Sequence, residues 1–338
     1  MKLNIAINGF GRIGKISLRI IEELREQGLD IQVVAINSPS TSAEHISYLI
    51  KYDSVFKNSF VNSIKIISEN NNDYIELNNN KIKIIRCYDL KQINWEEIGA
   101  KYIIESSGAY RTLEKATLHI EQGAKKVIIS APSDAPTFIY GVNHYDYDKN
   151  MNVISNASCT TNCLAPLIKI LNDNFIVEEA LVSSVHSSTA SQNIVDGNSK
   201  KDWRLGRSTL NNIIPTSTGA AKAVSQVLPE LEGKITGLAY RIPTINGSLI
   251  DLTVRLEKGT NYKDIMKTIK SNDLCKTIKV NDDPIVSTDI IGEKYSCVVD
   301  SNGGIELNKH FYKILAWYDN EYGYTSRMID MLLYISQM

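Results

Sequence analysis

A cysteine set among small hydroxyl and amide side chains is the clearest sign of chemistry in this sequence. The stretch Ser155–Cys163 reads Ser-Asn-Ala-Ser-Cys-Thr-Thr-Asn-Cys, and the strand-like pair Val153-Ile154 precedes it. Apolar residues at helical spacing follow directly, at Leu164, Leu167, Ile168, Ile170 and Leu171. We therefore predict a turn that places Cys159 at the start of a helix, where unpaired N–H groups and the helix dipole favour thiolate over thiol.

Two interpretations fit this local sequence. Cys159 is either a reactive nucleophile or a small buried apolar residue, as most intracellular cysteines are. Ser158 and Thr160 favour the first interpretation, because their hydroxyls could bind an anion beside the sulfur. Cys163 follows one helical turn later on the same face. We expect it to pack against its neighbours, because disulfides are rare in a reducing cytosol.

The composition indicates an ordinary cytoplasmic protein. The 338 residues suggest two domains, and a formal net charge of −1 gives no general attraction to nucleic acid or membranes. Five cysteines at irregular spacing match neither a disulfide framework nor a zinc site, and no histidine has metal-ligand spacing. Neither a signal peptide nor a membrane-spanning run of about 20 apolar residues is evident. We expect no metal, no membrane contact and no requirement for nucleic acid.

A glycine motif near the start of the sequence indicates nucleotide binding. Gly9-Phe10-Gly11-Arg12-Ile13-Gly14 follows a short apolar run, and a helix-like pattern and a second apolar strand at Gln32–Ile36 come after it. This order is typical of a dinucleotide-binding fold. Gly9 would permit the tight turn, Gly11 the approach of a pyrophosphate, and Gly14 close packing of helix on strand. The alternative is a glycine-rich turn that serves packing alone.

The end of the second strand lacks the acidic residue that usually accepts hydrogen bonds from the adenosine ribose. Ser38 stands at that position, after Asn37. No carboxylate would repel a 2′-phosphate there, so we expect NADP to be tolerated or preferred. The alternative is that Asn37 and Ser38 bind the ribose neutrally and NAD still dominates.

Strand and helix patterns alternate up to about residue 130 and predict a Rossmann-type, doubly wound parallel sheet. Ser107, Gly108 and Ser130 would lie at the carboxyl ends of strands, where such folds bind ligands. After the Cys159 helix the pattern indicates a second, α+β catalytic domain with a mostly antiparallel sheet. We predict a dinucleotide-binding domain over 1–158, completed by a C-terminal helix at 321–338, and a catalytic domain over 159–320.

Six stretches in the same order resemble the phosphorylating glyceraldehyde-3-phosphate dehydrogenase family. They are Ile7–Gly14, Ser155–Asn162, Lys200–Arg204, Pro215–Lys222, Asp251–Arg255 and Trp317–Tyr324. The resemblance implies oxidation of D-glyceraldehyde 3-phosphate to 1,3-bisphosphoglycerate in glycolysis and gluconeogenesis, with NAD or NADP and inorganic phosphate. It also implies a homotetramer, in which the polar loop 187–212 packs against a neighbouring subunit's cofactor site.

The resemblance assigns roles to individual residues. Cys159 would be the nucleophile and His186 its partner base. The substrate's own phosphate would be held by Thr189, Ser191 and Arg241. The attacking inorganic phosphate would be held by Ser158, Thr160, Thr218 and Gly219, with added charge from Arg204 or Arg207. Cofactor binding would involve Gly9, Phe10, Gly11, Arg12, Ile13, Gly14, Asn37, Ser38, Ser107, Gly108, Ser130 and Asn320, of which Asn320 fixes the nicotinamide carboxamide.

The chemistry of the reaction supports these roles. An isolated cysteine with a pKa of about 8.5 supplies little thiolate at neutral pH, so an imidazolium beside Cys159 would stabilise the anion. Attack on the aldehyde gives a thiohemiacetal, loss of hydride leaves a thioester, and phosphate displaces the sulfur. Two anion sites beside the thiol are therefore required, and the guanidinium fork of Arg241 suits phosphate oxygens.

Three departures from the family pattern bear on the cofactor. Ser38 replaces the usual ribose-binding Asp, Asn198 stands where NAD-selective members often carry Pro, and Tyr88 stands where many have Arg. The first two relax selection against a 2′-phosphate, so we predict use of both NAD and NADP. The alternative functions are an erythrose-4-phosphate dehydrogenase on the same scaffold and a non-catalytic binding protein that retains the fold.

Overall fold

The computed structural model describes residues 2–57, 61–199, 202–272, 274 and 277–338. Lys200 and Lys201, expected from the sequence to be solvated loop charges, lie outside the described residues. The chain divides into two compact units. The first comprises the residues up to Phe138, Asp146–Ala157 and Met328–Met338, and the second comprises Ile139–Tyr145 and Ser158–Arg327. The change of unit between Ala157 and Ser158 lies one residue before the boundary expected from the sequence.

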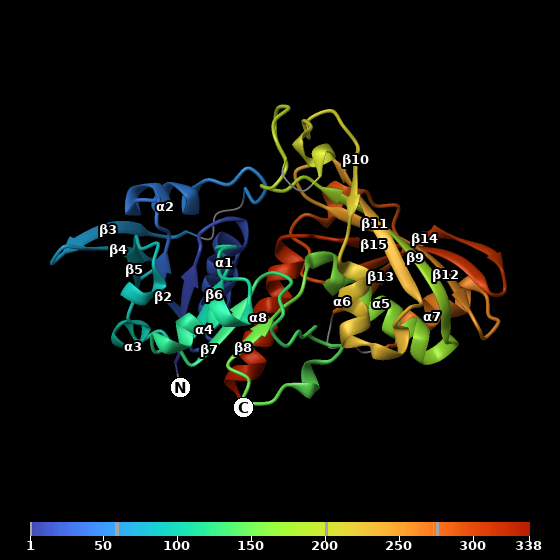
Figure 1. Ribbon diagram of the computed structural model, residues 1–338, viewed down its shortest axis with the longest axis horizontal. Helices are drawn as coiled ribbons and strands as arrows, with labels where there is room; N and C mark the ends of the chain where they lie inside the picture. Colours follow the sequence, from blue (N-terminus) through green and yellow to red (C-terminus); the bar gives the residue numbers. More distant parts are fainter. Residues whose placement is uncertain (1, 58–60, 200–201, 273, 275–276) are drawn as a thin grey trace. The chain divides into compact units, whose positions relative to one another are not determined.

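The first unit is built on a doubly wound sheet, as the sequence predicted (Figure 1). Within the described residues its strand order is β3-β4-β5-β2-β1-β6-β7-β8. The strands are β1 (Leu3–Asn8), β2 (Ile31–Asn37), β3 (Ile64–Glu69), β4 (Asn72–Leu77), β5 (Asn80–Ile85), β6 (Tyr102–Glu105), β7 (Lys126–Ile129) and β8 (Val153–Ser155). From β5 to β8 the neighbours are parallel, while β3, β4 and β5 pair antiparallel. The chain switches direction across the sheet at β1, between β2 and β6, so the carboxyl end of β1 is the expected ligand edge.

Burial on both faces explains the nearly continuous apolar strands of this sheet. Ile5, Ile7 and Ile36 are fully buried, as expected where helices cover a parallel sheet. The helices are α1 (Arg12–Glu26), α2 (Ala43–Lys51), α3 (Trp95–Ile98) and α4 (Leu113–Glu121), with a short 3₁₀ turn at Leu90–Gln92. Another 3₁₀ turn, His144–Asp146, lies where the chain passes from the second unit back to the first. Trp95 belongs to a buried cluster that includes residues of β1, β6 and β7.

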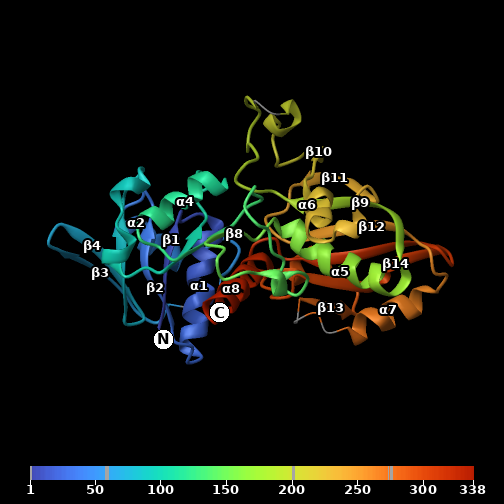
Figure 2. The ribbon, with the colours of Figure 1, turned by 60° about the horizontal axis from the view of Figure 1, so that its bottom comes forward.

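The second unit carries a mostly antiparallel sheet (Figure 2). Its order over the described residues is β10-β11-β9-β12-β15-β14-β13, and only the β9/β11 and β13/β14 neighbours there are parallel. The strands are β9 (Val177–Ser187), β10 (Ile214–Ser217), β11 (Ile235–Ile242), β12 (Ser248–Leu256), β13 (Ile278–Asn281), β14 (Cys297–Asn308) and β15 (Phe311–Tyr318). This confirms the predicted fold class.

Helices pack against one face of this second sheet. They are α5 (Cys159–Phe175), α6 (Ala220–Val227) and α7 (Tyr262–Ser271), with 3₁₀ turns at Trp203–Gly206, Pro229–Leu231 and Ser287–Ile290. Along β12, Ile250, Leu252 and Val254 are fully buried, whereas the side chains between them are half-exposed. The alternation is typical of an antiparallel sheet with one covered face.

Helix α8 (Tyr322–Ser336) ends the chain. It begins in the second unit and ends in the first. The sequence predicted a C-terminal helix that returns to the first domain, and the structure adds that its first turn belongs to the second. Among the described residues, no helix combines the length and the apolar character that a membrane span requires.

Candidate active site

Cys159 occupies the first position of α5, as the sequence predicted. Ser158 is the N-cap, and its hydroxyl accepts a hydrogen bond from the Thr161 N–H at 3.1 Å. Ala157 adopts φ +54°, a left-handed conformation that turns the chain sharply before the helix. The thiol is half-buried at the positive end of the helix. Cys163 is fully buried, which agrees with the packing role predicted for it.

The thiol contacts the imidazole that the sequence predicted as its partner. Cys159 Sγ lies 3.3 Å from His186 Nε2, although the residues are 27 positions apart. His186 lies near the end of β9 and is 3% exposed. Its Nδ1 lies 2.7 Å from the Ser187 carbonyl oxygen and 2.6 Å from Arg241 Nη1. The β9/β11 register places Arg241 directly opposite His186.

The pKa shifts favour a neutral pair in this structure. Burial raises the pKa of the Cys159 thiol, whereas the Arg241 charge, the Thr160 hydroxyl and the N–H groups of Thr160 and Cys159 lower it. Burial and the Arg241 charge lower the pKa of His186 to about 3. These directions differ from the thiolate–imidazolium pair expected from the sequence, because that expectation took account of neither burial nor the guanidinium. A neutral imidazole beside a thiol is the form that can accept the thiol proton.

Tyr318 was not predicted as a site residue, yet it joins the site from β15. Its buried hydroxyl lies 3.0 Å from Thr160 Oγ1 and 3.0 Å from Ser184 Oγ. Its ring stands edge-on to His186, with centroids 6.0 Å apart. The Thr160 side chain therefore has a protein partner. The sequence signals for Tyr318 are its position on the buried face of a strand and its place in the Trp317–Tyr324 stretch.

The predicted anion-binding residues all lie in the second unit, with different surroundings. Arg241 Nε is buried and has no hydrogen-bond partner among the described residues. The Thr189 hydroxyl lies 2.9 Å from Ser191 Oγ, so these two predicted phosphate ligands are brought together. The Thr218 hydroxyl accepts the Ala220 N–H at 3.2 Å. Gly219, the N-cap of α6, has no side chain, and the Thr218 hydroxyl caps the Ala220 N–H of the first turn in its place.

The structure distinguishes the two arginines between which the sequence could not decide. Arg207 Nε pairs with Asp196 Oδ2 at 2.9 Å on the surface. The Arg204 side chain has no such partner among the described residues. A guanidinium without a carboxylate is the better candidate for binding a phosphate.

Two serine hydroxyls hold the oxygen end of the Asn320 side-chain amide. Its Oδ1 accepts hydrogen bonds from Ser187 Oγ at 2.8 Å and from Ser248 Oγ at 2.9 Å. In this orientation both serine hydroxyls donate to Oδ1, and the amide nitrogen is the end directed away from them. The preceding Asp319 accepts the N–H groups of Glu321 and Tyr322, which fixes the backbone around Asn320.

The glycine motif in the first unit has the geometry of a dinucleotide-binding turn. Gly9 has φ +95°, and a Cβ there would lie 2.4 Å from the Ser107 backbone. A Cβ on Gly14 would lie 2.2 Å from the Gly9 carbonyl oxygen, whereas a Cβ on Gly11 would meet nothing within 4 Å. Gly11 caps α1 without a side chain, and the first turn has no acidic residue. A pyrophosphate therefore fits at this helix N-terminus.

Two other residues of the motif have structural roles in this arrangement. Phe10 is buried, and Arg12 Nη1 pairs with Asp53 Oδ2 at 2.5 Å. Ile13 is half-buried. The polar groups of this turn that remain for a ligand are therefore main-chain N–H groups.

The side chain of Asn37, predicted to bind the ribose, is fully used inside the protein. Its Nδ2 donates to Asn8 Oδ1 at 2.7 Å and to the Cys87 carbonyl at 3.0 Å, and its Oδ1 accepts the Cys87 N–H. The Ser38 hydroxyl donates to Thr41 Oγ1 at 2.9 Å and carries no charge.

The other predicted cofactor residues lie at the same edge of the sheet. The Ser107 hydroxyl bonds the Glu105 carboxylate, Gly108 has φ +75°, and the Ser130 N–H pairs with the Glu105 carbonyl. All three positions follow β6 or β7, as the sequence predicted.

Comparisons with known proteins agree with this geometry. Residues 3–113 match the NAD binding domain of glyceraldehyde 3-phosphate dehydrogenase, and residues 158–320 match its C-terminal domain. The chloroplastic glyceraldehyde-3-phosphate dehydrogenase GAPCP1 of Arabidopsis thaliana is 49% identical over 98% of this chain and 78% of its own length. The enzyme of Sclerotinia sclerotiorum is 48% identical over 99% of this chain and 97% of its own. The cytosolic enzyme of Sinapis alba is 45% identical over 99% of this chain and 98% of its own length.

The fold and these matches define an NAD-dependent oxidoreductase with a Rossmann domain. The chain belongs to the glyceraldehyde-3-phosphate dehydrogenase family. The activity expected from the sequence, phosphorylating oxidation of glyceraldehyde 3-phosphate with NAD, is confirmed at this level. No finding favours erythrose 4-phosphate as substrate or a non-catalytic role.

Proposed function

We propose that Cys159 and His186 carry out this reaction as nucleophile and base. The supporting observation is the 3.3 Å contact between Sγ and Nε2. Neutral His186 takes the thiol proton while the sulfur attacks the aldehyde carbon. The resulting imidazolium then lies beside the thiohemiacetal oxyanion and stabilises it.

Collapse of the oxyanion forms the thioester carbonyl and expels a hydride, for which bound NAD supplies the acceptor at nicotinamide C4. The thioester keeps the acyl group activated until inorganic phosphate attacks its carbonyl carbon. The C–S bond then breaks, the sulfur leaves as thiolate beside imidazolium, and the product is 1,3-bisphosphoglycerate. His186 returns its proton to the sulfur, which restores the starting pair.

Two sets of residues would hold the phosphates in this scheme. We assign the substrate phosphate to Arg241, Thr189 and Ser191, and Arg241 is supported by its buried Nε, which has no partner among the described residues. We assign inorganic phosphate to Ser158, Thr160, Thr218, Gly219 and Arg204, for which the N-terminus of α6, where the N-cap glycine has no side chain, is the main support. Asn320 would bind the nicotinamide carboxamide through its amide nitrogen, whose oxygen is held by two hydroxyls.

The single test of this scheme compares Cys159→Ser with the wild type. We expect the variant to lose at least about 10³-fold in kcat, because a serine hydroxyl is a far weaker nucleophile at neutral pH. Wild-type enzyme should form acyl phosphate in proportion to NADH and only when inorganic phosphate is present. Full dehydrogenase rate in the variant, or NADH production without acyl phosphate, would overturn the proposal.

We also propose that both NAD and NADP serve as cofactor. Ser38 supports this proposal, because the position where a carboxylate would repel the 2′-phosphate carries an uncharged hydroxyl. Asn198, on the exposed loop, adds no charge either. The main-chain N–H groups of the glycine turn are common to both cofactors and would not discriminate between them.

A homotetramer is the assembly that we propose for this chain. Large apolar side chains are strongly exposed in and beside the loop 187–212, namely Ile194, Val195, Trp203, Leu210 and Ile213. Leu181, on the uncovered face of the second sheet, is 61% exposed. Apolar groups gathered in this way mark association surfaces. Sedimentation equilibrium tests this proposal, and a monomer at micromolar concentration contradicts it.

We further propose that the protein works in the cytoplasm. The cytosolic relative from Sinapis alba supports this location, although two of the similar Arabidopsis thaliana proteins are chloroplastic. Fractionation of cells with an antibody against the chain tests it, and recovery of the protein in an organelle would contradict it.

A further inference from the structure

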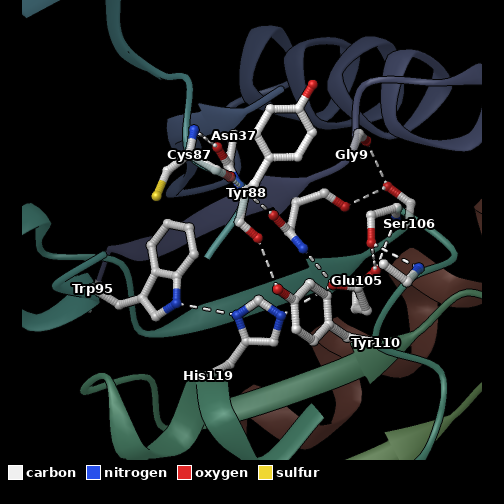
Figure 3. Close-up of polar contacts among 12 residues, drawn as sticks. Gly9, Asn37, Cys87, Tyr88, Trp95, Glu105, Ser106, Tyr110 and His119 are labelled. Atoms are coloured by element: carbon white, nitrogen blue, oxygen red, sulfur yellow. Dashed lines mark hydrogen bonds and ion pairs between the residues drawn. The ribbon is translucent and has the colours of Figure 1, made fainter. Parts of the chain in front are cut away.

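A buried carboxylate lies at the carboxyl end of β6, beneath the glycine turn. Glu105 is 1% exposed and receives four hydrogen bonds. The donors are Asn8 Nδ2 at 2.5 Å, the Ser107 N–H at 2.8 Å, Ser107 Oγ at 2.5 Å and His119 Nε2 at 3.0 Å. Figure 3 shows His119 between Trp95 and Glu105.

His119 takes part as a neutral donor, because Trp95 determines its tautomer. The Trp95 indole N–H, which can only donate, lies 3.1 Å from His119 Nδ1. Nδ1 must therefore accept, so the ring proton is on Nε2 and points to Glu105. His119 is fully buried, as is Trp95. The negative charge of Glu105 is thus held by neutral donors from β1, from the residue Ser107 after β6 and from α4, and α3 orients the His119 donor through Trp95.

The same network reaches the glycine turn by two routes. Ser106 Oγ donates to the Gly9 carbonyl oxygen at 2.7 Å. The Ser107 backbone, fixed by Glu105, lies where a Cβ on Gly9 would collide with it at 2.4 Å. Asn8, the residue before the turn, donates to Glu105 and accepts from Asn37. The turn is therefore packed against a loop whose position Glu105 determines.

A carboxylate is the side chain that this arrangement requires. Two carboxylate oxygens provide about four acceptor sites, one for each donor. A glutamine of the same shape has a single acceptor oxygen, and its amide hydrogens would face donors. At least one buried donor would lose its partner, and the Ser106–Ser107 loop would shift to satisfy it.

We infer that Glu105 is a positioning residue that fixes the glycine turn through Asn8 and the Ser106–Ser107 loop, and thereby sets the affinity for the dinucleotide. The inference rests on the proposal that this turn binds the cofactor. Glu105 itself is buried and would not touch the ligand. It contributes to binding by fixing the direction of the main-chain N–H groups that would face the pyrophosphate.

The test measures NAD binding to Glu105→Gln by titration calorimetry, with thermal unfolding of the cofactor-free proteins in parallel. Glu22→Gln is the matched control, because Glu22 is also a fully buried carboxylate of this unit. It accepts hydrogen bonds from Arg25 and from Asn80, away from the turn. Ser106→Ala is a second, milder variant that removes one hydroxyl contact to Gly9 and leaves the carboxylate in place.

We expect Glu105→Gln to raise the Kd for NAD by at least about tenfold and Ser106→Ala by about threefold, the scale of one lost hydrogen bond. Glu22→Gln should lower the unfolding temperature but leave the Kd unchanged. The KM for NAD should rise more than kcat falls. Wild-type affinity in both Glu105→Gln and Ser106→Ala would overturn the inference, as would an equal loss in Glu22→Gln. If Glu105→Gln does not fold, Ser106→Ala still tests whether the loop that Glu105 holds sets the turn through Gly9, and wild-type affinity in that variant would then overturn the inference. Absence of NAD binding to the wild type would instead overturn the proposed role of the turn.

Discussion

Arg241 Nη1 lies 2.6 Å from His186 Nδ1, and the Ser187 carbonyl oxygen lies 2.7 Å from the same nitrogen. A neutral ring nitrogen either accepts a proton or donates one, so only one of these contacts is a hydrogen bond at a time. With Arg241 as donor, the ring proton is on Nε2 and faces the sulfur. With Ser187 as acceptor, Nε2 has a lone pair and can take the thiol proton.

Removal of Arg241 should therefore change both substrate binding and the thiol. We expect Arg241→Ala to reduce kcat/KM for glyceraldehyde 3-phosphate by about 10²-fold or more, because a buried cation for the phosphate is lost. The pKa of Cys159 should rise, since the Arg241 charge lowers it. Iodoacetamide alkylation rates measured against pH would then reach their midpoint at higher pH. Arg207→Ala, which breaks a surface ion pair, is the control. If its alkylation midpoint shifted as far as that of Arg241→Ala, the effect assigned to Arg241 on the thiol pKa would be contradicted.

Tyr318→Phe should slow alkylation of Cys159 at neutral pH. The Tyr318 hydroxyl polarises the Thr160 hydroxyl, which lowers the pKa of the thiol, so its loss raises that pKa. The unfolding free energy should fall by about 1–3 kcal/mol, because buried hydroxyls lose a partner.

Tyr312→Phe is the matched control for this experiment. Tyr312 is also buried with two hydrogen bonds, but it lies at the opposite end of β15. It should lose similar stability with no change in alkylation. Equal alkylation rates in both variants would show that Tyr318 is structural only.

Ser38→Asp should make the enzyme selective for NAD. A carboxylate at the end of β2 would repel the 2′-phosphate, so we expect the KM for NADP to rise at least about tenfold while that for NAD changes little. Ser38→Ala removes the hydroxyl without adding charge and should keep both cofactors. A wild-type preference for NAD beyond about 1,000-fold, roughly 4 kcal/mol, would show that dual use is wrong.

Asp53→Asn should lower stability at neutral pH, and the deficit should shrink as the pH falls below the ordinary carboxyl pKa. Burial raises the pKa of Asp53, but the Arg12 and Lys15 side chains and two backbone N–H groups outweigh this and hold that pKa well below its ordinary value. A depressed carboxyl pKa contributes stability above the unfolded-state pKa and loses it as the pH falls. We expect a deficit of about 1–3 kcal/mol at pH 7 that shrinks below about pH 4. Urea unfolding of the variant and the wild type at pH 3 and at pH 7 measures this deficit.

Exposed Glu69, which pairs with Lys81, offers the comparison for this measurement. Glu69→Gln should have little effect at either pH, because surface ion pairs contribute little. A deficit in Asp53→Asn that is the same at pH 3 and pH 7 would mean that the lost interaction is not the ionised carboxylate.

The sequence predicted those parts of the site that local pattern determines. The glycine turn and the Cys159 helix start each lie within one short stretch, and both formed as expected. Tyr318 was missed because its partner Thr160 is 158 positions away in the sequence, and hydrophobic periodicity gives no information about contacts over such a separation. The hydrogen bonds of Asn37 were missed for the same reason, since they depend on the pairing of β2 with β1 and with β5. The directions of the pKa shifts of Cys159 and His186 were not predicted, because burial is a property of the packed unit.

The division of α8 between the units has a consequence for biosynthesis. The segment Met328–Met338 belongs to the unit that also contains the first residues of the chain. That unit therefore cannot acquire its full set of native contacts while the ribosome still holds the last turns of α8. The amino-terminal half of a nascent polypeptide therefore stays incomplete until residues 328–338 have emerged, and during this interval chaperones have access to it.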